Sequence, residues 1–125
     1  MLQTTTDVVI HGALDGLAAR HRAYVHNVAN AETPGFKPSE VPFEAQLRRV
    51  RDEMARPQQA AGHAPQPDLT PVPDSQSEER SDGNAVPIDS QVMRLEENSL
   101  IYGALIQAAH SRGEILRSAI TEGRK

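Results

Sequence analysis

The residues of this chain that could take part in catalysis or metal binding are histidines, paired carboxylates and hydroxyl side chains. The five histidines are His11, His21, His26, His63 and His110. None forms the i, i+4 histidine pair with a glutamate that metalloproteases use to bind zinc. Because the chain has no cysteine, a zinc–thiolate site is also excluded. We therefore interpret the histidines as surface or helix-interface residues.

Two pairs of adjacent glutamates, Glu78-Glu79 and Glu96-Glu97, could suggest a two-carboxylate catalytic site. Adjacent residues on a helix point about 100° apart, so these carboxylates would not face one substrate. The serines and threonines lie in no G-x-S-x-G pattern, and no glycine-rich loop could bind a phosphate. The sequence therefore predicts no catalytic residue, no cofactor and no metal, and hence no enzyme.

Composition narrows the remaining classes of function. The 125 residues carry a net charge of −4 and only 3% aromatic side chains, which is little for an ordinary globular core. Acidic and basic residues are interspersed, so no basic stripe supports binding to nucleic acid. No run of 18 apolar residues could span a bilayer. The segment Met1–Asp7 lacks the features of a cleaved secretory signal, so we expect the chain to stay in the cytosol or to leave it by another route.

Helical periodicity is confined to the two ends, because all nine prolines lie between Pro34 and Pro87. A first stripe with steps of four and three residues predicts a helix over about 5–31. Its members are Ile10, Leu14, Leu17, His21, Tyr24 and Val28. Thr4-x-x-Asp7 resembles a capping box at the helix start.

The last segment has the strongest pattern and predicts a helix over about 88–121. Its stripe continues without a break through Ile88, Val92, Leu95, Ser99, Tyr102, Ile106, Ala109, Gly113, Leu116 and Ile120. Further apolar residues widen this face, namely Leu100, Ile101, Leu105 and Ile115. A rod of this length cannot bury its stripe against itself, so it requires the first helix and other chains. Gly103 and Gly113 are either tolerated glycines or points where another helix approaches closely.

The middle of the chain is different in character. Phe43, Leu47, Val50 and Met54 predict a short amphipathic helix over 41–55. Residues 56–87 are rich in proline and poor in bulky apolar side chains, which is typical of a flexible or extended linker. Asp82-Gly83-Asn84 predicts a turn just before the last helix.

We therefore predict an all-α fold in which two long terminal helices pair antiparallel as a coiled-coil-like hairpin. A short middle helix and an extended, partly disordered linker complete it. The expected units are an N-terminal helix (1–33), a turn with the short helix (34–55), the linker (56–87) and a C-terminal helix (88–125). In the hairpin we expect Leu14 to lie near Leu116.

The stretch Asn27–Lys37 marks the end of the first helix. Thr33 precedes a proline and is pushed out of the helical region, and Pro34-Gly35 fits the centre of a type II turn. Asn27 and Asn30 could be ordinary helix C-terminal residues, or their amides could bond to a packed neighbour.

The amino-acid sequence of this stretch resembles the A-N-x-x-T-P-G-[FY]-K signature of the flagellar axial proteins, the rod and hook family. Two segments near the C-terminus, Ser81–Asp89 and Glu97–Tyr102, resemble the D-G-N-x-V-x-[IVLM]-D and [DE]-N-S-L-x-Y patterns of the proximal rod members of that family. The closing run Ile115–Ile120 and the short middle of the chain agree with those members. The resemblance covers both ends and skips residues 56–80, and it favours a packing role for the two asparagines.

This resemblance implies a structural subunit of the basal-body rod, with helices packed side by side into a tube and with no small-molecule substrate. It implies export through the flagellar type III apparatus without a cleaved signal peptide. The implied partners are other copies of the chain, the rod proteins FlgC, FlgF and FlgG, the rod adaptor FliE, the MS ring and the export apparatus. The residues expected at assembly contacts are Ile10, Leu14, Leu17, Tyr24, Val28, Asn30, Thr33, Pro34, Gly35, Phe36, Val92, Leu95, Asn98, Ser99, Leu100, Tyr102, Ile106, Gly113, Leu116 and Ile120.

Three other functions remain open at this stage. Another rod subunit such as FlgC is one, although the S-R-x-Y-E-x-N motif of that protein is absent here. A small soluble helical adaptor whose linker binds a partner is the second. An all-α enzyme is the third and has the least support, since no clustered polar site can be assembled from the sequence.

Overall fold

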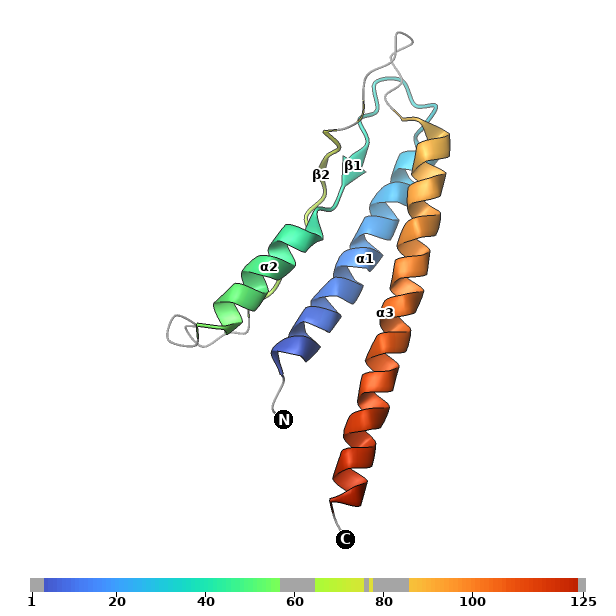
Figure 1. The fold of residues 1–125 in the computed structure, drawn as a ribbon. Coiled ribbons are helices and arrows are strands. Elements are labelled where there is room, and N and C mark those ends of the chain that lie inside the picture. The colour runs from blue at the N-terminus through green and yellow to red at the C-terminus, as the bar shows by residue number, and fades with distance from the viewer. Residues whose placement is uncertain (1–3, 57–64, 76, 78–85, 124–125) are drawn as a thin grey trace.

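The computed structural model of the chain describes residues 4–56, 65–75, 77 and 86–123. Within these ranges the elements are α1 (Thr5–Ala29), β1 (Ser39–Glu40), α2 (Phe43–Met54), β2 (Val72–Pro73) and α3 (Ile88–Glu122). α1 lies between α2 and α3, and α1 and α3 run in opposite directions, so that the start of α1 and the end of α3 lie at the same end of the molecule (Figure 1). The predicted all-α fold with an antiparallel pair of terminal helices and a short middle helix is confirmed.

The start of α1 follows the predicted capping box. The Thr4 hydroxyl accepts a hydrogen bond from the Asp7 N–H at 3.3 Å, and Asp7 Oδ2 accepts one from the Thr4 N–H at 3.1 Å. Two N–H groups that would lack helical partners are thus satisfied. At its other end α1 stops at Ala29, two residues before the expected limit.

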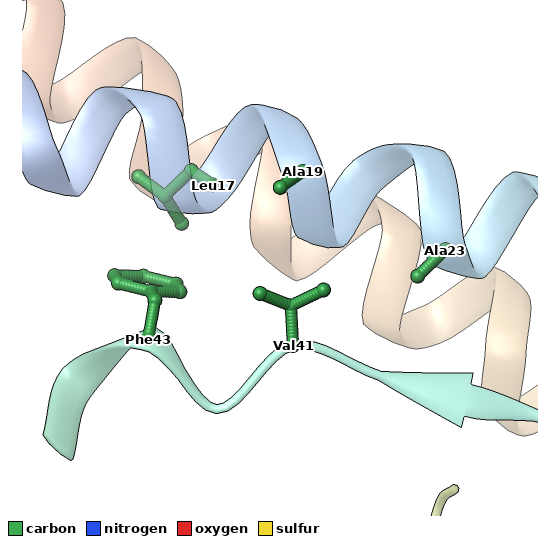
Figure 2. Close-up of a cluster of buried hydrophobic side chains, with 5 residues drawn as sticks. All are labelled: Leu17, Ala19, Ala23, Val41 and Phe43. Carbon is green, nitrogen blue, oxygen red and sulfur yellow. The ribbon is translucent and has the colours of Figure 1, made fainter. Parts of the chain in front are cut away.

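The buried apolar cluster lies on the side of α1 that faces α2 and β1 (Figure 2). It consists of Leu17, Ala19, Ala23, Val41 and Phe43. Three of these come from α1 and two from the segment between β1 and the first turn of α2. Because two of the α1 members are alanines, the chain after β1 can lie close to the α1 backbone.

Two glycines of α1 allow the same close approach. A Cβ built on Gly16 would lie 2.4 Å from Cγ of Phe43, and one built on Gly12 would lie 2.8 Å from Cδ2 of Leu47. Any larger residue at Gly16 would therefore push α2 away. The two helix glycines that the sequence singles out, Gly103 and Gly113, are different, because a Cβ at either position would meet nothing within 4 Å.

Polar contacts fix the antiparallel register of α1 and α3. Asn27 contacts Gln91, the carbonyl of Leu17 contacts Asn98, and Asp7 contacts Arg112. Leu14 therefore lies opposite the stretch between Asn98 and Arg112, and the expected pairing with Leu116 is wrong. The reason is that α3 continues from Gly113 to Glu122, beyond the start of α1.

The face that α3 turns toward α1 also differs from the prediction. Gln91 and Asn98 are 1% and 4% exposed, whereas Val92 and Ile106 are 40% and 43% exposed. The expectation that the unbroken apolar stripe would pack on α1 is thus wrong for most of its members, because Leu95 and Ala109 are half-buried and the others are exposed. The exposed members are Ile88, Val92, Ser99, Tyr102, Ile106, Gly113, Leu116 and Ile120. α3 is rotated so that polar side chains meet polar partners on α1.

Part of the predicted linker is extended, as its composition indicates, and it is attached to the helices. β2 pairs antiparallel with β1, with Ser39 opposite Pro73 and Glu40 opposite Val72. Leu69 packs against the apolar cluster. The rest of the predicted linker, including the Glu78-Glu79 pair, His63 and the predicted turn at Asp82–Asn84, lies outside the described residues.

Candidate assembly surface

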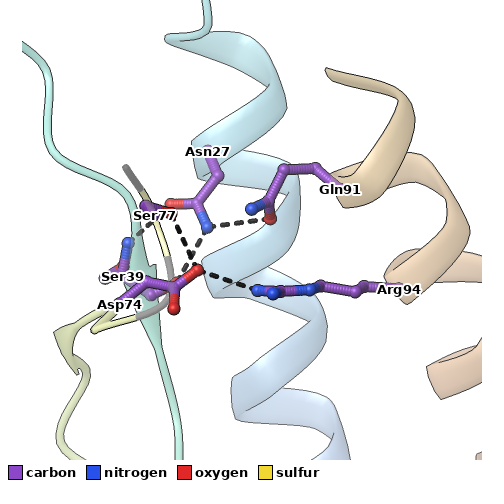
Figure 3. A network of polar contacts seen from close by, with 6 residues as sticks. All are labelled: Asn27, Ser39, Asp74, Ser77, Gln91 and Arg94. Carbon is purple, nitrogen blue, oxygen red and sulfur yellow. Dashed lines mark hydrogen bonds and ion pairs between the residues drawn. The ribbon is translucent and has the colours of Figure 1, made fainter. Parts of the chain in front are cut away.

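Asn27 links three segments of the chain through one buried side-chain amide (Figure 3). Its Nδ2 donates to the Ser39 carbonyl at 2.8 Å and to Gln91 Oε1 at 3.0 Å. Its Oδ1 accepts from the Ser39 N–H at 2.9 Å. The amide thus pairs with Ser39 as a neighbouring peptide group would, and it joins α1 to β1 and to α3 at once.

An ion pair formed by the residue just after β2 reinforces this junction. Arg94 donates to Asp74 Oδ2 at 2.8 Å, and the Asp74 side chain is 1% exposed. The Ser77 hydroxyl donates to the same oxygen at 2.9 Å, and the Asp74 N–H donates to the Pro38 carbonyl at 2.9 Å. Asp74 is therefore held to α3 through Arg94, and the two residues before it are paired with β1 (Figure 3).

Two further polar contacts lie along the α1–α3 interface. Asn98 Nδ2 donates to the Leu17 carbonyl at 2.9 Å, while the buried Asn98 Oδ1 has no partner among the described residues. Near the start of α1, Arg112 donates to Asp7 Oδ1 at 3.2 Å and to the Thr4 hydroxyl at 3.1 Å. Hydrogen bonds from Thr4, and then those from Arg112, hold the pKa of Asp7 below its usual value.

The turn after α1 has the predicted geometry. The Phe36 N–H donates to the Thr33 carbonyl at 3.2 Å, and Gly35 has a φ of 74°, as the third position of a type II turn requires. Asn30 bonds within its own helix end, since its Nδ2 donates to the His26 carbonyl at 2.9 Å. The alternatives left open for the two asparagines therefore resolve differently: Asn30 caps the helix locally, and Asn27 binds packed neighbours.

Most of the exposed large apolar side chains among the described residues lie on α3. In the run from Leu100 to Ile106 apolar side chains point in every direction, because successive residues turn by about 100°. α1 covers the side of Asn98 and Leu105, whereas Leu100 is 76% exposed and Ile101 is 47% exposed. A helix that is apolar on all sides is normally buried on all sides. This surface is therefore suited to contact other protein chains.

The end of α3 carries the same kind of surface. Ile115 and Ile120 are 69% and 68% exposed, and they belong to the part of α3 that extends past α1. Over residues 113–122 this extension is about 15 Å long. It places apolar side chains where α1 cannot reach them.

A groove of about 360 Å³ lies between α1 and α3, with mostly apolar walls. Its lining residues are Leu17, Ala18, His21, Arg22, Asn98, Ser99 and Tyr102. The described residues contain no cluster of three or more histidine, aspartate or glutamate side chains that could hold a metal ion. No helix in the described ranges is long and apolar enough to cross a membrane.

The residues predicted at assembly contacts fall into three groups. Leu17, Tyr24 and Asn98 are buried within the chain, and Ile10, Leu14, Val28, Asn30, Phe36 and Leu95 are half-buried. The exposed group comprises Thr33, Pro34, Gly35, Val92, Ser99, Leu100, Tyr102, Ile106, Gly113, Leu116 and Ile120. This last group is the most accessible to other chains, and its role in assembly stays a prediction.

Three residues that attach α3 to the rest of the chain were not predicted from the sequence, namely Gln91, Arg94 and Asp74. One sequence signal could have identified Gln91. Gln91 and Asn98 are seven residues apart, as are Asn98 and Leu105, so a polar heptad position runs beside the apolar stripe.

Known proteins similar to this chain share one description. A flagellar basal body rod protein FlgB from Borrelia hermsii is 34% identical over 118 residues, which cover 80% of this chain and 85% of the relative. A protein of the same name from Yersinia ruckeri is 33% identical over 72% of this chain and 74% of its own length. Another from Escherichia coli K12 is 29% identical over 89% of both chains. No protein-family model matches the chain.

Proposed function

This chain belongs to the FlgB family of flagellar basal body rod proteins, and we propose that it acts there as a non-enzymatic subunit whose α3 is enclosed by neighbouring subunits. It is a structural component of the basal body, in the proximal rod. The proposal goes further by assigning α3 as the helix that other subunits surround.

One observation carries this proposal: α3 is apolar on all sides around Leu100–Ile106, and α1 covers only one side. Burying a Leu or Ile side chain contributes about 1.5–3 kcal/mol relative to leaving it exposed. Several such side chains remain exposed in the single chain, among them Leu100 and Ile115. Packing of α3 against other subunits would recover this free energy, and repetition around a tube would multiply it.

A structural role also fits the kind of surface that the chain offers. Among the described residues, most of the exposed large apolar side chains follow α3 from Ile88 to Ile120 instead of surrounding a polar pocket. Enzymes bind substrates in concave sites with a few convergent polar groups. A long apolar helix face is instead typical of helix-to-helix contacts.

We expect the neighbours to be other copies of this chain together with FlgC, FlgF, FlgG, the adaptor FliE, the MS ring and the export apparatus. The route is expected to be type III export without a cleaved signal peptide. The relatives' shared name favours this member of the family over FlgC, and it favours a rod subunit over a soluble adaptor or an all-α enzyme.

Deletion and complementation test the proposal. Cells that lack the gene should have no flagella, and the intact gene should restore them. Leu100→Asp, which places a charge on the exposed face of α3, should be made at normal levels and yet fail to restore flagella. Ala45→Asp places the same charge on the exposed side of α2 and should restore them. Flagellated deletion cells, or full rescue by Leu100→Asp, would contradict the proposal.

A further inference from the structure

α3 carries two parallel stripes, and the less apolar one faces α1. The first consists of positions seven residues apart, Gln91, Asn98, Leu105 and Arg112, and we call it the inner stripe. The second consists of Ile88, Val92, Ser99, Ile106 and Gly113, and we call it the outer stripe. If apolar burial alone set the rotation of α3, the outer stripe would pack on α1, because burying Val and Ile is more favourable than burying Gln and Asn.

Each polar member of the inner stripe has its own partner atoms on α1. Gln91 Oε1 accepts from Asn27 Nδ2 at 3.0 Å, and Asn98 Nδ2 donates to the Leu17 carbonyl at 2.9 Å. Arg112 donates to Asp7 and Thr4 at 3.2 and 3.1 Å. These three contacts are spread along the whole of α1, so a shift or rotation of α3 would break all of them together.

The inner stripe is costly for stability, which points to a different use. Gln91 and Asn98 are buried, and Asn98 Oδ1 has no partner in the described part of the chain. A buried polar atom without a partner is unfavourable. Buried polar residues at helix interfaces are best known for fixing register at a cost in stability.

We propose that Gln91, Asn98 and Arg112 are positioning residues that set the rotation and register of α3 on α1, so that the outer stripe stays exposed. Given the proposed rod function, the outer stripe is the surface that a neighbouring rod subunit contacts. The inner stripe thus holds the hairpin in one arrangement and keeps the more apolar stripe free for assembly.

Disulfide trapping can read the rotation directly, because the chain has no cysteine of its own. Ala13 and Leu105 pack against the same buried cluster, whereas Ile106 belongs to the outer stripe. We expect Ala13→Cys to form a disulfide with Leu105→Cys in preference to Ile106→Cys, in the purified full-length chain and in assembled rods. Non-reducing gels and peptide mass spectrometry measure the ratio of the two products.

Three variants then test the positioning role. Gln91→Ala with Asn98→Ala removes the buried amides. We then expect less of the disulfide between positions 13 and 105 (the 13–105 product) and more of the disulfide between positions 13 and 106 (the 13–106 product). Moving the amides by one residue, by adding Val92→Gln and Ser99→Asn, should make 13–106 the main product even if the alanine variant folds poorly. The control, Glu96→Ala with Gln107→Ala, alters two exposed positions and should keep 13–105.

The outcomes separate this inference from the proposed function. Retention of 13–105 in the variant with moved amides would overturn the positioning role, and so would the absence of a 13–105 product in the parent. A shift to 13–106 in cells that still swim would overturn the claim that the outer stripe must stay exposed for assembly. Neither result bears on whether deletion of the gene abolishes flagella.

Discussion

The two sides of α1 are packed by different means. Toward α2 the contact is close and is built around the Phe43 ring, which lies over Gly16. Arg20 of α1 lies over the same ring and donates hydrogen bonds to the Val41 carbonyl. Toward α3 the contact includes the apolar side chain of Leu105, but amides and an arginine fix its register, and one buried amide oxygen stays unpaired among the residues described. The first contact is suited to stabilise the subunit, and the second is suited to select an arrangement.

This difference explains how one short chain can fold and still assemble. If α3 used its outer stripe on α1, Val92 and Ile106 would no longer be exposed to neighbouring subunits. Because the apolar cluster lies between α1 and α2, α3 is free to keep residues such as Leu100 and Ile106 exposed. Stability and assembly are thus assigned to different faces of the molecule.

The largest expected effect comes from removing the ring between α1 and α2. Phe43→Ala should lower the free energy of unfolding by about 3–5 kcal/mol, because it deletes a buried aromatic side chain and leaves a cavity. Leu100→Ala, at a position 76% exposed, should change it by no more than about 0.5 kcal/mol. Urea unfolding of the purified chain followed by circular dichroism measures both. If both substitutions lowered the free energy of unfolding equally, the α2 side of α1 would contribute no more to stability than the exposed face of α3.

Glycine substitutions sharpen the same comparison. Gly16→Ala should destabilise the chain by about 1–3 kcal/mol, since the new methyl group would overlap the Phe43 ring and force α2 to shift. Gly103→Ala meets nothing within 4 Å and should stabilise α3 by up to about 1 kcal/mol through helix propensity. Thermal unfolding midpoints of the two variants should therefore move in opposite directions. A stabilising Gly16→Ala would show that α2 is not closely packed on α1.

The turn after α1 provides a third test that does not depend on packing. Gly35 has a positive φ and open space around its Cβ position, so any effect of a side chain there comes from the backbone. Gly35→Val should cost about 1–2 kcal/mol, because a β-branched residue resists the left-handed region. Gly35→Asn, which tolerates that region, should cost less. If the two variants have the same unfolding midpoint and restore motility equally, the turn geometry is not needed.

Local signals in the sequence predicted the helices and the turn well, whereas the register and rotation of α3 on α1 were harder to predict. The Thr4–Asp7 cap, the Pro34-Gly35 turn and the limits of α3 each depend on a few adjacent residues, and all agree with the structure within about two residues. The antiparallel direction of the helix pair was also predicted correctly. Its register was not, because the heptad pattern is satisfied by many offsets.

The rotation of α3 shows why the rest could not be predicted from periodicity. An apolar stripe indicates that a face is buried in the working protein, but it does not say by which partner. Val92 and Ile106 belong to the strongest stripe and are left exposed by their own chain, whereas Gln91 is buried by it. Gly16 was missed for a related reason, since its importance depends on a Phe43 ring 27 residues away in the sequence.

The smallest expected effect concerns the Asp7–Arg112 contact, which ties the start of α1 to α3. Hydrogen bonds from Thr4, followed by those from Arg112, lower the pKa of Asp7 below its usual value of 3.8. A carboxylate whose pKa is lowered by folding stabilises the folded state above its unfolded pKa, and this contribution is lost as the pH falls through the folded pKa. Asp7→Asn should therefore lower the urea midpoint by a constant amount at neutral pH. The difference from the parent should begin to shrink near pH 3.8 and vanish at lower pH.

Asp15→Asn removes an exposed carboxylate elsewhere on α1 and is the charge-matched control for this experiment. Because Asp7 and Arg112 are both partly exposed, added salt should also weaken the effect of Asp7→Asn. A difference that persisted unchanged below pH 3 would show that Asp7 acts through its shape in the capping box and not through its charge. In that case Arg112 would contribute to the register of α3 only through its bond to the Thr4 hydroxyl, and the weight of the positioning role would fall on Gln91 and Asn98.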